Sequence, residues 1–184
     1  MPPIKILLFL AATAVMAYVS RASLGAPRSH GFSRFFAWEA LLALVLLNPE
    51  TWFRRPFAWF QVVSWLLLFS SLVPLTWGTL LLKRLGKPDA RRSDDRLFGL
   101  EKTTELVTSG IYGLIRHPMY GSLLLVAWGV FFKKPGWLGG LLALAATVFL
   151  TLTARIEEGE NLRYFGPAYR DYMSRTKMFL PYVF

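Results

Sequence analysis

Residues 106–120 read LVTSGIYGLIRHPMY and lie between a polar loop and an apolar stretch. The segment contains His117, one of only two histidines, with Arg116 before it and Pro118 after it. Ionisable side chains are costly where a chain enters lipid, unless they are paired or serve a function. The segment therefore predicts the start of a membrane helix and marks a candidate site.

The composition of the whole chain favours a membrane protein. Of its 184 residues, 54% are apolar and 16% are aromatic, and the apolar residues come in long runs. Such runs are typical of membrane spans, and lipid leaves an open chain only the helix to satisfy its backbone. We therefore predict an all-α, polytopic helical bundle. The chain has no cysteine, so it has no disulfide framework or thiolate nucleophile, and two histidines argue against a metal site.

Five apolar segments predict about five transmembrane helices within a single domain of 184 residues. These segments cover approximately residues 3–20, 35–53, 57–82, 119–132 and 137–153. The first resembles a signal peptide, but it lacks a clean small-x-small cleavage site and other apolar segments follow, so we interpret it as a span. The polar stretches 83–118 and 155–184 are expected to lie outside the lipid as a loop and a helical tail.

The distribution of charge predicts the topology. The formal net charge is +10, and the basic residues flank apolar runs, so anionic lipid headgroups are the expected partner rather than nucleic acid. Sixteen of the 21 Lys and Arg residues lie in segments 21–34, 83–118 and 155–184, which five spans place on one side. The positive-inside rule predicts that this side and the C-terminus are cytoplasmic, in an inner membrane, with the N-terminus outside.

The first candidate cluster surrounds His117. Pro118 suits the first turn of a helix, so His117 would lie at the helix N-terminus, where free N–H groups favour an anion. Arg116 adds a permanent positive charge suited to a carboxylate or phosphate. The alternative is interfacial anchoring, because Arg, His and the nearby Tyr112 and Tyr120 all favour the headgroup level.

The second candidate cluster follows the fifth apolar segment. It consists of Arg155, Glu157, Glu158, Glu160 and Asn161. Glu157 and Asn161 are four residues apart and share a helix face. These groups can hold a cation or a ribose, and the alternative is an ordinary solvated turn beyond the membrane.

Two other features are ambiguous. Phe165, Tyr169 and Tyr172 have the spacing of an amphipathic helix that lies on the membrane, which favours packing over chemistry. Glu39 is an acid within a predicted span, and an intramembrane acid is a functional candidate. The other possibility is that Glu39 snorkels to the surface or pairs with an Arg.

Four motifs in order make the chain resemble a known superfamily. These are LVTSGIY at 106–112, RHPMY at 116–120, the pair Glu157-Glu158, and FGxxYxxY at 165–172 followed by Pro181. In this order and spacing they resemble the isoprenylcysteine carboxyl methyltransferase and phospholipid methyltransferase superfamily of integral membrane enzymes. The resemblance covers about residues 106–181.

The resemblance implies a methyltransferase that uses S-adenosyl-L-methionine at the cytoplasmic face, held by the loop 83–118 and the tail 155–184. The cofactor-binding residues expected from it are Leu106, Val107, Tyr112, His117, Pro118, Tyr120 and Glu157. We add Gly110 and Asn161 as candidates from their place beside these residues in the sequence. Methyl transfer is an in-line displacement, which needs positioning and exclusion of water. The candidate catalytic residues are Arg116, His117, Glu158 and Arg155.

The acceptor stays open at this stage, as a lipophilic small molecule or a lipidated substrate that is isoprenylcysteine carboxylate-like or phospholipid-like. In the prenyl-cysteine enzymes an Arg one turn before the acidic pair engages the substrate, and Thr153 stands there in this chain. An ionised carboxylate needs no base, whereas an amine or alcohol would need one, for which Glu39, Glu158 and His117 are candidates.

Two alternatives to methyl transfer remain. Sterol and steroid reductases have a similar Arg-His-Pro stretch and an aromatic tail and would use NADPH, but the double Glu and the small size favour methyl transfer. A non-enzymatic small membrane subunit would leave the clustering of His, Arg and Glu as a coincidence.

Overall fold

The computed structural model describes residues 3–87 and 103–181. Within these ranges the regular elements are all helices, and the only β-type pairing is one isolated bridge between Ile115 and Lys177. The predicted all-α fold is confirmed. The predicted loop 83–118 is described only at its two ends, because residues 88–102 lie outside the described ranges.

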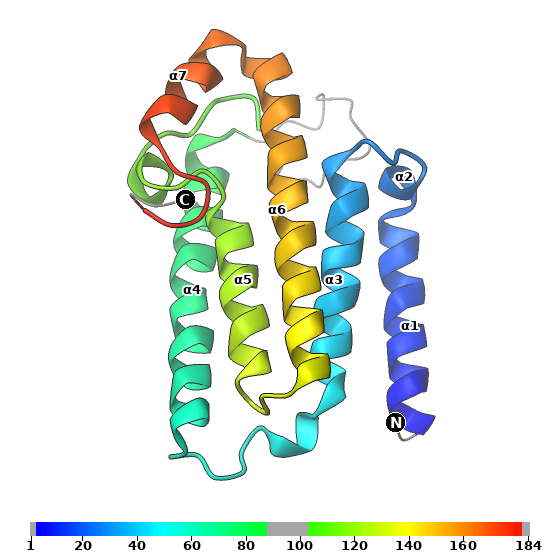
Figure 1. Ribbon diagram of the computed structural model, residues 1–184. Coiled ribbons are helices and arrows are strands. Elements are labelled where there is room, and N and C mark those ends of the chain that lie inside the picture. The colour runs from blue at the N-terminus through cyan, green and yellow to red at the C-terminus, as the bar shows by residue number, and fades with distance from the viewer. Residues whose placement is uncertain (1–2, 88–102, 182–184) are drawn as a thin grey trace.

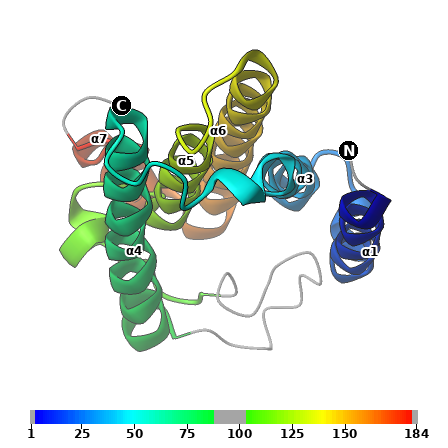
Figure 2. The same ribbon diagram turned by 90° about the horizontal axis from the view of Figure 1, so that it is seen from below.

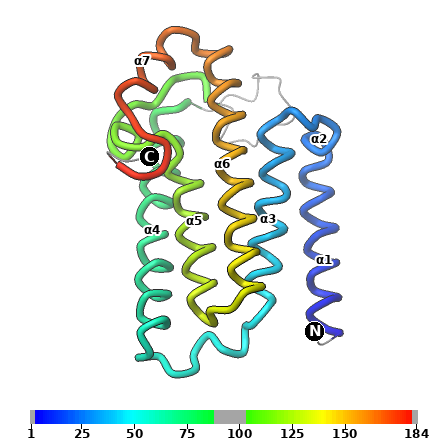
Figure 3. Tube along the Cα trace, viewed as in Figure 1, coloured from blue at the N-terminus to red at the C-terminus, as the bar shows by residue number. Residues whose placement is uncertain are grey.

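The helices stand side by side, as Figure 1 and Figure 3 show. The α-helices are α1 (Pro3–Val19), α2 (Arg21–Leu24), α3 (His30–Leu47), α4 (Trp59–Leu85), α5 (Pro118–Phe131), α6 (Trp137–Phe165) and α7 (Pro167–Arg175), and the two 3-10 helices are η1 (Pro49–Thr51) and η2 (Gly110–Gly113). Seen along the bundle, five helices form a bent row in the order α1, α3, α6, α5, α4 (Figure 2).

Three of these helices are long and apolar enough to cross a membrane by length and composition. They are α3, α4 and α6, while α1 and α5 are shorter apolar helices. A span needs roughly 20 residues. The chain therefore forms a helical membrane bundle, and the count of five crossing helices stays a prediction. The bundle places α2, η2 and α7 at one end (Figure 1), which we call the α7 end.

Two helices differ in extent from the predicted segments. The second predicted segment starts at residue 35, whereas α3 begins at His30 and ends at Leu47. The fifth was predicted to end at residue 153, whereas α6 continues to Phe165. Its polar extension is rich in Glu and Arg, which are good helix formers even outside lipid. The helix ends at Gly166, whose φ of 62° is readily adopted only by glycine.

Small side chains bring the central helices close together. Ala127 of α5 and Ala143 and Ala146 of α6 are fully buried in one core cluster. In membranes, small residues at helix contacts allow the backbones to approach and pack. On the other side of α5, the hydroxyl of Ser64 in α4 donates a hydrogen bond of 2.6 Å to the carbonyl oxygen of Gly129. The result is a rigid core beneath the α7 end.

A buried lysine closes the opposite end of the bundle. Lys133, in the turn between α5 and α6, is 2% exposed. Its amine donates to Oε1 of Gln61 at 3.1 Å and lies 3.2 Å from the ring centroid of Trp65. The amide of Gln61 in turn donates to the carbonyl oxygen of Lys133 at 3.0 Å. These contacts fasten the α5–α6 turn to α4.

Candidate cofactor site

The α5–α6 hairpin brings the two polar clusters together at the α7 end. The hydroxyl of Tyr120, in the first turn of α5, donates to Oε2 of Glu157 on α6 at 2.6 Å. Arg116, just before α5, donates through Nε to Oε1 of Glu158 at 2.6 Å. Side chains that lie about 40 residues apart in the sequence therefore meet in space.

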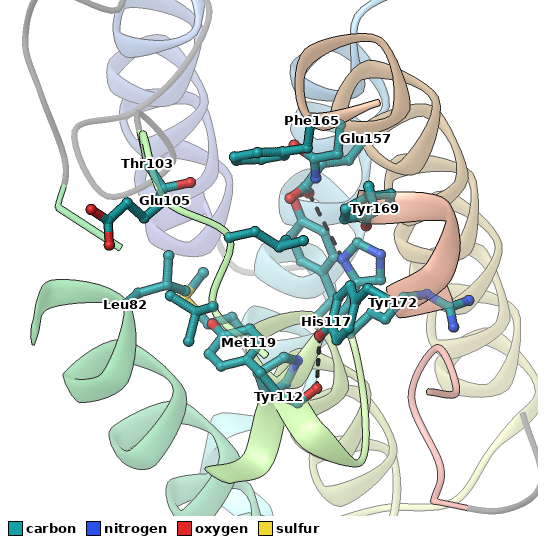
Figure 4. A pocket seen from close by; sticks show the side chains of 16 residues that line it. Leu82, Thr103, Glu105, Tyr112, His117, Met119, Glu157, Phe165, Tyr169 and Tyr172 are labelled. Carbon is teal, nitrogen blue, oxygen red and sulfur yellow. Dashed lines mark hydrogen bonds and ion pairs between the residues drawn. The ribbon is translucent and has the colours of Figure 1, made fainter. Parts of the chain in front are cut away.

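A cavity lies between these clusters (Figure 4). Eight of the nine predicted cofactor-binding residues line it: Leu106, Val107, Tyr112, His117, Pro118, Tyr120, Glu157 and Asn161. Its volume is about 80 Å³, well below the roughly 300 Å³ at which small-molecule pockets begin. A ligand as large as a nucleoside therefore fits only if the cavity walls move apart, so the distance between the walls affects binding.

Gly110 does not line the cavity but shapes its floor. It begins η2 with a φ of 60°, and a Cβ there would lie 2.6 Å from Cδ1 of Leu81. Only glycine combines this backbone conformation with such a close approach. The turn it permits presents Tyr112 to the cavity, so the direct contact predicted for Gly110 is replaced by an indirect one.

The predicted catalytic residues fall into two groups. Arg116 lines the cavity, but its guanidinium is bound by Glu158 and by the carbonyl oxygens of Met173 and Thr176. Glu158 is buried behind the lining as the partner of Arg116, and Arg155 is exposed and outside the lining. Arg116 and Glu158 thus hold the site together, and their part in chemistry stays a prediction.

His117 stands between the two carboxylates. Its ring stacks on Tyr120, with centroids 5.5 Å apart. Its Nε2 lies 3.3 Å from Oε1 of Glu158 without hydrogen-bond geometry, and its Nδ1 lies 4.0 Å from Oε2 of Glu157. The backbone N–H donates to the carbonyl oxygen of Met178 at 3.1 Å. The imidazole is therefore fixed in place at the cavity wall.

The aromatic tail was predicted to lie on the membrane, and this interpretation is wrong. Tyr169 and Tyr172 of α7 are 3% and 4% exposed, and with Phe165 they line the cavity. The hydroxyl of Tyr172 donates to the carbonyl oxygen of Tyr112 at 2.8 Å. Gly166 turns the chain so that α7 folds back over the site, and its apolar face packs on protein instead of lipid.

Four other lining residues were not predicted as site residues, although Met119 lies within the motif RHPMY. They are Leu82, Thr103, Glu105 and Met119. Leu82 lies in the last turn of α4 and Met119 in the first turn of α5, so each has the appearance of an ordinary membrane residue. Glu39 was a candidate base, but it accepts a hydrogen bond of 2.8 Å from the hydroxyl of Thr13 in α1 and does not line the cavity.

The buried phenols of the site stay protonated at physiological pH. Burial raises the pKa of Tyr112 and of Tyr169, and the carboxylate of Glu157 raises both further. Each phenol is therefore a neutral hydrogen-bond donor. The hydroxyl of Tyr112 is buried and has no hydrogen-bond partner among the described residues. A buried donor without a partner costs free energy. A ligand atom that accepts a hydrogen bond from this hydroxyl would remove that cost.

The lining chemistry suits an adenosyl sulfonium donor. Glu157 offers a carboxylate for an amine or ribose, Asn161 an amide, and Phe165 and Tyr169 flat faces for an adenine. The orphaned hydroxyl of Tyr112 adds a further donor. The residues present therefore fit the group that the sequence resemblance implied.

The sequence profile of the phospholipid methyltransferase family matches residues 83–168. The predicted superfamily resemblance is confirmed. This match includes most of the residues that line the cavity, from Thr103 to Phe165, and leaves out Leu82, Tyr169 and Tyr172. It also supports the prediction that the chain is a methyltransferase.

Individual relatives carry a related name. The chain is 27% identical over 161 residues to a methanethiol S-methyltransferase of Pseudomonas deceptionensis, covering 79% of this chain and 58% of the relative. It is 26% identical over 149 residues to methanethiol S-methyltransferase 1 of Bradyrhizobium diazoefficiens, covering 80% of this chain and 49% of the relative. The chain thus spans only about half the length of these relatives. No solved structure matches it.

Proposed function

We propose that the protein transfers a methyl group from S-adenosyl-L-methionine to a lipophilic acceptor at the membrane surface. The observation that carries this proposal is the coincidence of the family match with the cavity. Residues 83–168 supply the carboxylate, imidazole and most of the aromatic groups that face one another there. The predicted topology puts this cavity on the cytoplasmic side.

The chain's residues position the reactants. When bound, the donor would supply a methyl group from a positively charged sulfur: the C–S bond would break with its electron pair left on that sulfur, and a lone pair of the acceptor would form the new bond. Glu157 and Asn161 would hold the polar part of the donor, and α7 would exclude water from above. Such positioning and desolvation are the main requirements of an in-line displacement.

A neutral acceptor such as a thiol or amine must also lose a proton. His117 is the best-placed group to receive it, because its ring is held at the cavity wall by Tyr120 and by the neighbouring Glu158. The buried position limits competition from water. A carboxylate acceptor would leave this role unused.

An apolar groove supports a lipophilic acceptor. It has a volume of about 590 Å³, runs between α4, α5 and α6, and is lined almost entirely by apolar atoms. Its lining includes Ile115, Gly121 and Phe179, and the ring of Phe179 lies 6.2 Å from that of His117. An acyl or alkyl chain would enter here from the bilayer. The names of the relatives favour a small thiol as the second candidate acceptor.

We expect S-adenosylhomocysteine, the demethylated donor, to bind the detergent-solubilised protein with micromolar-range affinity, while NADPH does not. The variants His117→Ala and Glu157→Ala should each weaken binding, because each removes a group from the cavity wall. Calorimetry provides the measurement. Asp171→Ala, which removes an exposed carboxylate from α7, is the matched control and should bind normally. Binding of NADPH alone would replace this proposal by a reductase.

The groove predicts a difference between long and short acceptors. Gly121 faces the groove, and a Cβ there would meet only the carbonyl oxygen of Phe179, at 3.9 Å. Gly121→Leu should therefore fold and fill the groove. We expect it to reduce label transfer from radioactive donor to membrane lipids strongly while leaving methylation of methanethiol unchanged. Label appearing only on methanethiol, in both proteins, would assign a small thiol as the acceptor and leave the groove without a role.

A further inference from the structure

The three acids that follow the membrane part of α6 have three different partners. Glu157 faces the cavity and accepts from Tyr120, and Glu158 pairs with Arg116. Glu160 turns the other way and meets the start of α3, at His30. The cluster therefore divides between one group that lines the cavity and two that fasten α6 to other elements.

The contact between Glu160 and His30 is close and mostly buried. One carboxylate oxygen, Oε1, accepts from the backbone N–H of His30 at 3.2 Å, and Oε2 lies 2.5 Å from Nδ1 of the ring. The side chain of His30 is 1% exposed. A carboxylate at the first turn of a helix also accepts hydrogen bonds from the free N–H groups there and is favoured by the helix dipole. The contact joins positions 130 residues apart.

Helix geometry places the two fastened acids on either side of the cavity wall. Successive residues of an α-helix are about 100° apart. Taking the midpoint of Glu157 and Asn161 as the direction of the cavity, Glu158 lies roughly 80° to one side and Glu160 roughly 80° to the other. The extension of α6 is thus held from both flanks. The contact to His30 restrains it on the α3 side, opposite Arg116, while Tyr120 holds Glu157 between them.

We propose that His30 and Glu160 are positioning residues for the cofactor cavity. The inference rests on the proposed function, and it adds that the α3 N-terminus sets the place of the wall that carries Glu157 and Asn161. The cavity is narrow, about 80 Å³, so a small tilt of α6 changes which ligand atoms the wall can reach. Neither residue touches the cavity itself.

The test compares substitutions at Glu160 in calorimetric titrations with S-adenosylhomocysteine, below the melting temperature of each variant. Glu160→Ala and His30→Ala should each bind about tenfold to a hundredfold more weakly, as the loss of one or two hydrogen bonds to the ligand would cause. Glu160→Gln keeps an acceptor for the His30 N–H and a second polar atom for the ring, so it should rescue most of the affinity. The double alanine variant should bind no worse than either single one.

The possible failures are distinguishable. If the unmodified protein does not bind S-adenosylhomocysteine, the proposed function and this inference both fall. If it binds and the alanine variants bind equally well, only the inference falls, whatever their melting temperatures. Should the alanine variants not fold, Glu160→Asp decides, since its shorter side chain keeps the charge but cannot span the same distance. Normal affinity in Glu160→Asp together with normal affinity in Glu160→Gln would overturn the inference.

Discussion

Arg116→Ala is expected to lower the stability of the folded protein by about 3 kcal/mol, because it leaves the carboxylate of Glu158 buried without its cation. Both side chains are 9% exposed and joined at 2.6 Å. Arg116 also donates to the carbonyl oxygens of Met173 and Thr176, so its loss releases the end of α7. In a protein of this size the loss corresponds to a melting temperature lower by about 6–12 °C.

Replacing both partners shows how much of this loss comes from the unpaired charge of Glu158. In Arg116→Met combined with Glu158→Leu no unpaired charge is buried, so the melting temperature should return most of the way to that of the unmodified protein. Arg116→Lys keeps the charge but not the planar set of donors, and it should be intermediate. Thermal unfolding in detergent measures all four proteins. Single variants as stable as the parent would show that this pair does not hold α6 to the segment before α5.

The second large effect is expected at Lys133. Lys133→Met removes the ammonium from the face of Trp65 and leaves Oε1 of Gln61 unpaired. A desolvated cation–π contact contributes about 2 kcal/mol, and an unsatisfied buried acceptor costs about 1–3 kcal/mol. The avoided cost of burying a charge offsets part of this, so we expect a net loss of about 2 kcal/mol. Binding of S-adenosylhomocysteine by the folded variant should not change, because Lys133 lies at the other end of the bundle.

The pH dependence gives this prediction a second readout. Burial lowers the pKa of Lys133 below its ordinary value of 10.5. Between the lowered and the ordinary value the unfolded chain binds more protons than the folded one, so this group makes stability rise with pH in that window. Lys133→Met should lack this rise. Lys134→Met, which changes the exposed neighbour, is the matched control and should keep both the rise and the stability.

Much of the fold follows from the sequence because lipid restricts the choices. Apolar runs long enough to cross a bilayer have only the helix available to satisfy their backbone. A helix in the structure overlaps each of the five predicted segments. The sequence did not show that α6 continues to Phe165, because beyond lipid a polar helix gives no hydropathy signal. It also misled about α7, since an amphipathic face looks the same whether it covers lipid or protein.

The candidate site, like the fold, was predictable from the sequence only in part. Residues 106–120 were recognisable because charged and backbone-restricting residues crowd the entry to an apolar helix. Eight of these fifteen residues line the cavity, His117 and Tyr120 among them. The sequence did not show which acid pairs with which partner. The sequence shows Glu157, Glu158 and Glu160 as near equals, and only their angles on α6 and the places of Tyr120 and Arg116 assign them different roles.

The sequence by itself determined that the chain is a helical membrane bundle with a polar site beside the segment 106–120, because hydropathy and local motifs are properties of neighbouring residues. The tertiary structure alone decided the closure of the cavity by α7, the burial of Lys133 against Trp65, and the contact between His30 and Glu160. These contacts join residues far apart in the chain. Their partners are set by how the helices pack, and no local pattern records that packing.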